Sequence, residues 1–213
     1  MKTVLCYGDS NTWGSATAPR PDDRYPPDER WTGILRRRLG PEWLVVEEGL
    51  PGRTTVHPDP IEGSWLDGSA YLLPCLRSHQ PLDAIVLMLG TNDLKARFNV
   101  PAGDIAAGIG RLLTIIRTAE VGPNNSVPPV LVVCPAPILD RFGERPDFAD
   151  MFLGGHAKSM RLPPLYEAVA GEHGAAFLDA GTVMTSSAFD GIHLDPDAHA
   201  ALGQAVAGAV LAF

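Results

Sequence analysis

Five short apolar runs, each separated from the next by a longer segment, most constrain what this chain can fold into. They are residues 3–7, 44–47, 84–89, 130–134 and 176–178. Strands that are apolar nearly throughout are buried on both faces, as in parallel sheets. Between these runs, apolar residues recur at helical spacing, which predicts helices over residues 30–39, 105–119, 166–172 and 196–211.

The alternation of strands and helices predicts right-handed crossovers around one parallel sheet. The predicted fold class is therefore α/β, a three-layer α/β/α sandwich with a five-stranded parallel sheet. No internal repeat or low-complexity linker interrupts the 213 residues, and we expect a single domain over residues 1–213.

The composition excludes two classes of partner. The formal net charge is -8, and no basic cluster is longer than Arg36–Arg38, so the chain lacks the basic surface that binds nucleic-acid backbones. No segment offers the ~18 uninterrupted apolar residues of a membrane span.

The start of the chain bears on its location. The apolar stretch at residues 3–7 is too short for a secretory signal and is followed closely by Asp9, so we expect a cytoplasmic protein.

The three cysteines, Cys6, Cys75 and Cys134, are far apart in the sequence, and each lies in an apolar stretch. Their odd number and their spacing fit neither a disulfide framework nor a metal site. We therefore expect three small, buried, hydrophobic side chains.

Polar clusters follow the predicted strands. Residues 8–12 follow the first strand, residues 49–55 the second, residues 90–93 the third, and residues 190–193 come after the last strand and a short loop. Open α/β sheets bind ligands at the carboxyl ends of their strands. We therefore expect the four clusters to meet at one edge, with the Pro/Gly-rich segments 18–30, 51–68 and 136–155 as candidate pocket walls.

Ser10 is the candidate nucleophile. It lies where a buried strand ends and a glycine-flanked turn opens, which exposes a side chain at the top of a sheet. A serine hydroxyl needs a positioned base before it attacks, and a histidine oriented by a carboxylate is the common solution. The alternative is that Ser10 only caps the next helix.

Asp190 and His193 are the candidate orienting acid and base. At this spacing on a loop, the carboxylate can reach Nδ1 of the imidazole and leave Nε2 facing Ser10. The alternative is an Asx turn followed by a surface histidine. Asp195 is also near, but Asp195–Pro196 is typical of the cap and first residue of the last helix.

An acyl-transfer site also needs hydrogen-bond donors for the oxyanion of the tetrahedral intermediate. Asn92 can offer its side-chain amide, Gly52 its backbone N–H, and Ser10 its own backbone N–H. As purely structural residues, Asn92 would be a turn former and Gly52 a position of positive φ.

Together these motifs resemble the SGNH/GDSL hydrolase superfamily. The matching blocks, from near residue 2 to near residue 200, are residues 8–10, Gly52, residues 90–93 and residues 190–193, in the family's order. Asn11 replaces the leucine of the family's name-giving motif. Residues 30–33, 47–50 and 53–55 are similar to the mycobacterial arylesterase/acyltransferase group within it.

The resemblance implies a flavodoxin-like SGNH hydrolase fold and a serine esterase that cleaves short-chain or aryl esters through an acyl-Ser10 intermediate, with acyltransferase or perhydrolase activity besides. It implies Ser10 as nucleophile, His193 as general base and acid, Asp190 as its orienter, and Ser10, Gly52 and Asn92 as the oxyanion hole. It implies no cofactor and no metal, a small-molecule ester as substrate, and a homo-oligomer such as an octamer. The acyl-pocket residues that it implies are Asn11, Trp13, Lys95, Phe148, Phe152 and Ile192.

Two other functions remain open at this point. The first is a binding module that holds a phosphate or flavin after the first strand, although the chain has no glycine-rich fingerprint or Walker lysine there, and Asp9 would repel phosphate. The second is a metallohydrolase, because His57, Asp59, Asp190 and His193 are suitable ligand types.

Overall fold

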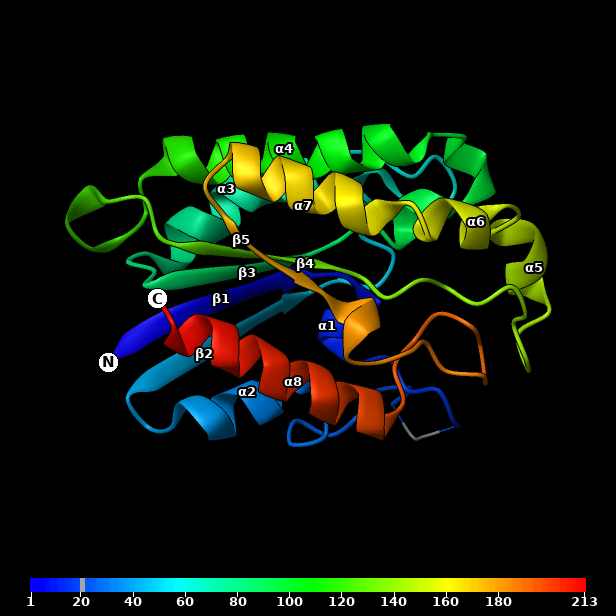
Figure 1. Cartoon of the computed structure of the whole chain (residues 1–213), viewed down its shortest axis with the longest axis horizontal. Helices are drawn as coiled ribbons and strands as arrows, with labels where there is room; N and C mark the ends of the chain where they lie inside the picture. Colours follow the sequence, from blue (N-terminus) through cyan, green and yellow to red (C-terminus); the bar gives the residue numbers. More distant parts are fainter. Residues whose placement is uncertain (20–21) are drawn as a thin grey trace.

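The computed structural model describes residues 1–19 and 22–213 and contains one five-stranded, all-parallel sheet. Its strand order is β2-β1-β3-β4-β5 (Figure 1). The strands are β1 (Lys2–Gly8), β2 (Trp43–Gly49), β3 (Ala84–Met88), β4 (Val130–Cys134) and β5 (Ala176–Asp179). All five predicted strands are thereby confirmed, each within one or two residues of its expected ends.

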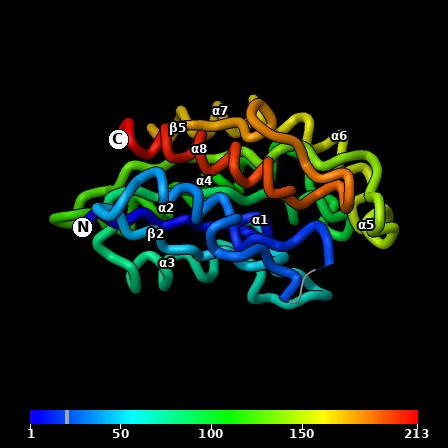
Figure 2. Tube along the Cα trace, turned by 90° about the horizontal axis from the view of Figure 1, so that it is seen from below, coloured from blue at the N-terminus to red at the C-terminus, as the bar shows by residue number. Residues whose placement is uncertain are grey.

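Helices cover both faces of the sheet, which confirms the α/β sandwich (Figures 1 and 2). One face packs on α2 (Trp31–Leu39) and α8 (Pro196–Leu211), and the other on α3 (Gly68–His79), α4 (Ala102–Ala119) and α7 (Leu162–Glu172). Alternate residues of β1 enter opposite cores: Leu5 and Tyr7 join the α3/α4/α7 side, while Val4 and Cys6 join the α2/α8 side. This two-sided burial explains why the strands are apolar throughout.

Shorter elements lie mainly on the loops that leave the sheet. They are α1 (Ser10–Trp13), α5 (Asp147–Met151) and α6 (Gly155–Ser159), with the 3-10 turns η1 (Ser64–Leu66), η2 (Asn92–Leu94), η3 (Ala96–Phe98), η4 (Pro123–Asn125) and η5 (Ala180–Thr182). The segment 136–155, expected to be a loop, thus contains α5 and the start of α6. Of the predicted loop 18–30, residues 20–21 lie outside the described residues.

Helix α3 was not expected from the sequence. It begins at Gly68 and contains Pro74, and both residue types disfavour a helix interior. The helix forms because the Asp67 side chain accepts hydrogen bonds from the N–H groups of Ser69 and Ala70, and because Leu72, Cys75 and Leu76 are buried against the sheet. Tertiary packing therefore outweighs local propensity here.

Both chain ends lie at the amino ends of the strands, opposite the edge where α1 begins (Figure 1). Lys2, Trp43 and Phe213 line one cavity at that end. The three cysteines are buried free thiols, as predicted. In the described part of the chain, no helix has the length and apolar character needed to cross a membrane.

Helix α8 crosses α2 closely enough that only glycine fits at position 203. A Cβ at Gly203 would lie 2.5 Å from Cβ of Ile34 and 2.7 Å from the carbonyl oxygen of Trp31, whereas a Cβ at Gly208 would meet no atom within 4 Å. We expect Gly203→Ala to lower the free energy of unfolding by about 1–3 kcal/mol. The matched Gly208→Ala should raise it by about 0.5–1 kcal/mol. Urea unfolding of both variants tests this, and equal effects would contradict the close crossing.

Candidate active site

The turn after β1 carries Ser10 as the first residue of α1. Asp9 is the N-cap, and its side chain accepts a hydrogen bond from the N–H of Asn11, so Ser10 itself does not cap the helix. Gly8 has no room for a side chain, because a Cβ there would lie 2.1 Å from Oγ1 of Thr12 and 2.9 Å from the carbonyl oxygen of Met88. The short helix therefore starts directly at the end of the strand, with the Ser10 side chain at its first turn.

His193 and Ser10 are 183 residues apart in sequence and in hydrogen-bond contact in space. Nε2 of His193 lies 3.0 Å from Oγ of Ser10, and Nδ1 lies 2.6 Å from Oδ2 of Asp190. With Nδ1–H donating to Asp190, Nε2 is the acceptor for the serine proton. The three side chains predicted from the sequence to interact are thus brought together.

Asp190 is held by a tight turn as well as by the imidazole. Its Oδ1 accepts hydrogen bonds from the N–H groups of Ile192 and His193, each at 2.9 Å. Burial raises the pKa of the Asp190 carboxyl, but the bond to His193 and these two N–H groups outweigh burial, so the pKa lies below its ordinary value. The carboxylate therefore stays ionised beside the imidazole.

Asp195 lies at the predicted cap position, and its carboxylate bonds to side chains outside α8. It is the N-cap residue of α8 with Pro196 after it, as predicted, but its side chain makes no capping bond. Instead, Oδ1 accepts hydrogen bonds from Oγ1 of Thr17 at 2.6 Å and Oγ of Ser187 at 2.8 Å. Asp195 therefore joins the segment that carries His193 to the segment after α1.

The three candidate oxyanion donors line one cavity beside the serine. Gly52 has φ +85°, in the left-handed region that favours glycine. The Asn92 amide donates one hydrogen bond to the carbonyl oxygen of Arg53 at 3.1 Å, which leaves its second N–H for another acceptor. Asp93 accepts bonds from N–H and Oγ1 of Thr55, which tie the loops of Gly52 and Asn92 together.

Arg53 holds the ends of two strands together beside the oxyanion donors, a role that was not predicted from the sequence. Its side chain is buried, donates to the carbonyl oxygens of Gly8 and Glu48, and lies 4.2 Å from the ring centre of Tyr7. It therefore joins the ends of β1 and β2 directly behind Gly52. A single arginine in a loop carries no sequence signal for such burial, because arginines are mostly exposed.

The cavity at Ser10 has a volume of about 330 Å³. An apolar wall of Phe148, Met151, Phe152 and Ile192 faces a polar wall that includes Glu62 and Lys95. Four of the six predicted acyl-pocket residues therefore line it: Lys95, Phe148, Phe152 and Ile192. Asn11 does not; its amide donates to the carbonyl oxygen of Ile192 at 3.4 Å, and Trp13 lines an adjoining cavity instead.

The phenylalanines also pack beneath a loop, as the sequence allowed. Phe148 and Phe152 contact each other and Phe142 edge-on or tilted, and the ring centre of Phe148 lies 6.4 Å from that of His193. Phe148 and Phe152 therefore do both: they pack against Phe142, and they also line the cavity at Ser10.

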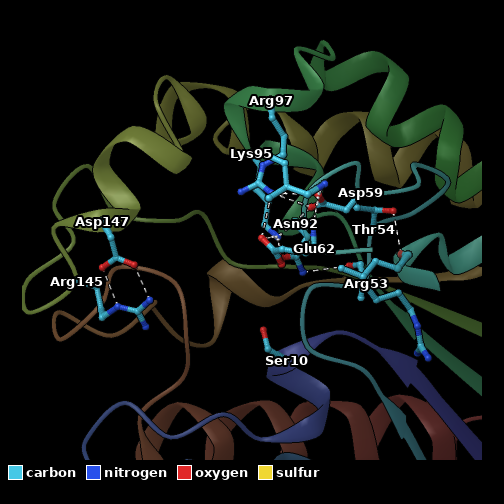
Figure 3. Close-up of polar contacts among 12 residues, drawn as sticks. Ser10, Arg53, Thr54, Asp59, Glu62, Asn92, Lys95, Arg97, Arg145 and Asp147 are labelled. Atoms are coloured by element: carbon cyan, nitrogen blue, oxygen red, sulfur yellow. Dashed lines mark hydrogen bonds and ion pairs between the residues drawn. The ribbon is translucent and has the colours of Figure 1, made fainter. Parts of the chain in front are cut away.

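The polar wall is a network of four charged side chains beside Asn92 (Figure 3). Nζ of the buried Lys95 donates to both carboxylate oxygens of Glu62 at 2.8 and 2.9 Å, and Arg97 bonds to Asp59 at 3.1 Å. Lys95 also lies 3.6 Å from Asp59, and Arg97 3.2 Å from Glu62. Two positive and two negative charges thus compensate each other next to the oxyanion donors.

The four residues of the metallohydrolase hypothesis do not form one ligand set. His57 stacks on Phe98, and Asp59 is engaged with Lys95 and Arg97, whereas Asp190 and His193 bond to each other. Among the residues that the structure describes, one group of three has ligand atoms close enough together to hold a metal ion. It consists of Glu48, Cys75 and His79 and includes none of these four residues. The metallohydrolase hypothesis is therefore wrong for these residues.

Comparisons with known proteins agree with this geometry. The chain matches the GDSL-like Lipase/Acylhydrolase family over residues 6–201. A carbohydrate acetylesterase from Sinorhizobium meliloti has a TM-score of 0.92 and 41% identity, over 100% of this chain and 99% of that chain. An aryl esterase from M. smegmatis has the same TM-score, identity and coverage. A search among curated proteins found no match.

The fold, the serine-bearing turn and these relatives define the class of protein: the enzyme is a carboxylic ester hydrolase. The chain belongs to the GDSL-like Lipase/Acylhydrolase family. The family resemblance carried by the sequence motifs and the predicted fold are therefore confirmed, and a non-catalytic binding module is no longer needed to explain the residues at this edge.

The N-cap carboxyl behind the serine generates a prediction about stability. Burial raises the pKa of Asp9 to about 6, although the N–H of Asn11 and the nearby His193 and Arg53 favour the charged form. Its Oδ2 is buried and has no hydrogen-bond partner among the described residues. The folded state thus holds this proton more tightly than the unfolded state, so Asp9 contributes stability at low pH that is lost as the pH rises toward and past 6.

We expect Asp9→Asn to remove this loss, because asparagine is neutral and can still accept from Asn11. The unfolding free energy of the variant minus that of the wild type should increase by about 2 to 3 kcal/mol between pH 4 and pH 7.5. Urea unfolding at both pH values measures it. A difference that does not change with pH would contradict the raised pKa.

Proposed function

We propose that the enzyme hydrolyses esters through a covalent acyl-Ser10 intermediate. Oγ of Ser10 attacks the ester carbonyl carbon while Nε2 of His193 takes the hydroxyl proton. The tetrahedral intermediate collapses, the bond to the leaving alcohol breaks, and His193 gives the proton to the departing oxygen. Water then attacks the acyl-enzyme with His193 again as the base, which releases the carboxylic acid and restores Ser10.

The observation that carries this proposal is the continuous line of hydrogen-bonded atoms from Asp190 through His193 to Ser10, with distances of 2.6 and 3.0 Å. Asp190 orients the imidazole and stabilises its protonated form. The N–H groups of Ser10 and Gly52 and the free N–H of Asn92 are the proposed oxyanion donors. Losing one such donor typically costs ~10²–10³ in rate.

The proposed substrates are small esters with short acyl groups. The ion pair of Lys95 and Glu62 lines the cavity together with the apolar wall, so a long acyl chain in this cavity would contact charged side chains. The structural relatives named above are an aryl esterase and a carbohydrate acetylesterase, which support aryl acetates and acetylated carbohydrates as candidate substrates.

Acyl transfer to an alcohol, or to peroxide, is a second proposed outcome of the same intermediate. The wall of Phe148, Phe152 and Ile192 reaches His193, and an apolar wall at this place favours an organic acceptor over water. Product analysis with 4-nitrophenyl acetate and added propanol tests it, because transfer yields propyl acetate and hydrolysis yields acetate. Acetate as the exclusive product would overturn it.

We also propose that the enzyme acts in the cytoplasm as a homo-oligomer, such as an octamer. Three free thiols suit a reducing compartment. Trp65 and Tyr71 line one cavity and are both exposed, as expected of an apolar surface that meets another subunit. A monomeric mass by light scattering would overturn the assembly.

Replacement of the nucleophile tests the central proposal. Ser10→Ala should reduce hydrolysis of 4-nitrophenyl acetate at least ~10³-fold and abolish covalent labelling by a fluorophosphonate, with an unchanged circular dichroism spectrum. Ser78→Ala, on the exposed face of α3, is the matched control and should keep both. Retained activity in Ser10→Ala would exclude the acyl-enzyme.

Chain-length preference tests the proposed substrate size. We expect kcat/KM for 4-nitrophenyl acetate to exceed that for the octanoate at least ~100-fold, because the octanoyl chain would contact the ion pair of Lys95 and Glu62. Met151→Ala enlarges the cavity at its apolar wall and should narrow this ratio about tenfold, since each buried CH₂ contributes about 0.8 kcal/mol. A ratio that is unaffected by Met151→Ala would place the acyl group elsewhere.

A further inference from the structure

A second cavity, of about 460 Å³, adjoins the cavity at Ser10. Four residues line both: Ser15, Pro51, Arg145 and His193. The second cavity is therefore continuous with the reactive centre and is not a separate site on the surface. Its volume lies within the range of small-molecule binding pockets.

The two cavities border different parts of the proposed catalytic machinery. Gly52 and Asn92, the proposed oxyanion donors, line only the first, whereas Asp190, which bonds to the imidazole, lines only the second. In the proposed mechanism His193 protonates the departing oxygen. The alcohol part of the ester therefore extends along His193 into the second cavity.

Arg145 lines both cavities, and its guanidinium is paired with Asp147 (Figure 3). Nε and Nη2 donate to the two carboxylate oxygens of Asp147 at 2.9 and 2.7 Å, and the guanidinium carbon lies 3.9 Å from the ring centre of Phe148. The bidentate pair and the ring contact favour this orientation of a side chain that is 44% exposed. Nη1, on the other edge, has no hydrogen-bond partner among the residues that the structure describes.

The charges around Arg145 favour a neutral, oxygen-rich ligand over an anion. Asp147 already balances the guanidinium, and Asp23 and Asp190 line the same second cavity. Among the residues that the structure describes, an anionic alcohol would therefore meet two carboxylates and one cation that Asp147 already pairs. A hydroxyl group, in contrast, can accept from the arginine and donate to a carboxylate. Trp13 adds an aromatic wall to these polar groups.

We propose that Arg145 is a specificity-determining residue that donates from Nη1 to a hydroxyl oxygen of a polyhydroxylated leaving group, held in the second cavity with Asp23, which lines the same cavity, as acceptor. The preferred substrate is then a sugar acetate with free hydroxyl groups. This inference rests on the acyl-Ser10 mechanism, because that mechanism decides which cavity receives the alcohol.

The test compares two acetates that share the acyl group and differ in the alcohol. Methyl 6-O-acetylglucoside offers hydroxyl groups, and 4-nitrophenyl acetate offers none. We expect Arg145→Met to lower kcat/KM for the sugar acetate at least tenfold, mainly through KM, and to change kcat/KM for the aryl acetate less than twofold. Asp147→Asn releases the anchored edge of the guanidinium and should cause a smaller loss in the same direction.

Arg141→Met is the matched control, because Arg141 is exposed on the same loop and lines neither cavity. It should leave both acetates unaffected. The aryl acetate also reports on folding and on the triad, so a failure of the acyl-Ser10 mechanism appears separately, as retained activity in Ser10→Ala.

Three outcomes of the Arg145→Met experiment would overturn the inference. Unchanged kinetics on the sugar acetate would show that Arg145 does not contact the alcohol. An equal fall with both acetates would show that Arg145 acts through Phe148 on His193. A selective loss with 4-acetoxybenzoate, whose leaving group carries a carboxylate, would show that the arginine recognises anions instead.

Discussion

Every strand of the sheet runs in the same direction, and this constraint assembles the site. Gly8 at the end of β1 pairs with Gly49 of β2 and Met88 of β3, so three strands end at one level. Ser10, Gly52 and Asn92 lie only a few residues beyond that level. The close approach extends to the helix after β1, because a Cβ on Gly49 would lie 2.2 Å from the backbone nitrogen of Trp13. A shift of one strand would separate the nucleophile from its proposed oxyanion donors.

Asp190 and Lys95, two charged groups that the site keeps away from water, are compensated locally. Asp190 receives three hydrogen bonds, two of them from backbone N–H groups of its own turn. Lys95, which is buried, pairs with Glu62 and Asp59. An uncompensated charge in such surroundings would cost several kcal/mol. Such local compensation is the fixed electrostatic environment on which the proposed transition-state stabilisation depends.

The strands and the candidate triad could be predicted from the sequence because each leaves a local signal. A strand buried on both faces is apolar throughout, and a serine or histidine next to glycine and aspartate forms a short motif. Helix α3 could not be predicted, because Gly68 and Pro74 both disfavour a helix. It forms through the Asp67 cap and through packing on the sheet, and the packing cannot be read from local sequence. Neither Arg53 nor Arg145 could be singled out from the sequence, because their contacts form only in the folded chain. Arg53 contacts Tyr7 and Gly8, and Arg145 contacts Phe148. The roles of the site residues remain predictions until the variants are measured.

The two ends of the chain lie together beside the amino ends of the strands, on the side away from Ser10 (Figure 1). A purification tag, a fluorescent fusion or a tether to a solid support at either end would therefore leave the mouth of the cavities open. If the enzyme were attached to a support through Met1 or Phe213, its substrate entrance would face the surrounding solution. The architecture thus separates the places suited to engineering attachment from the place where esters bind.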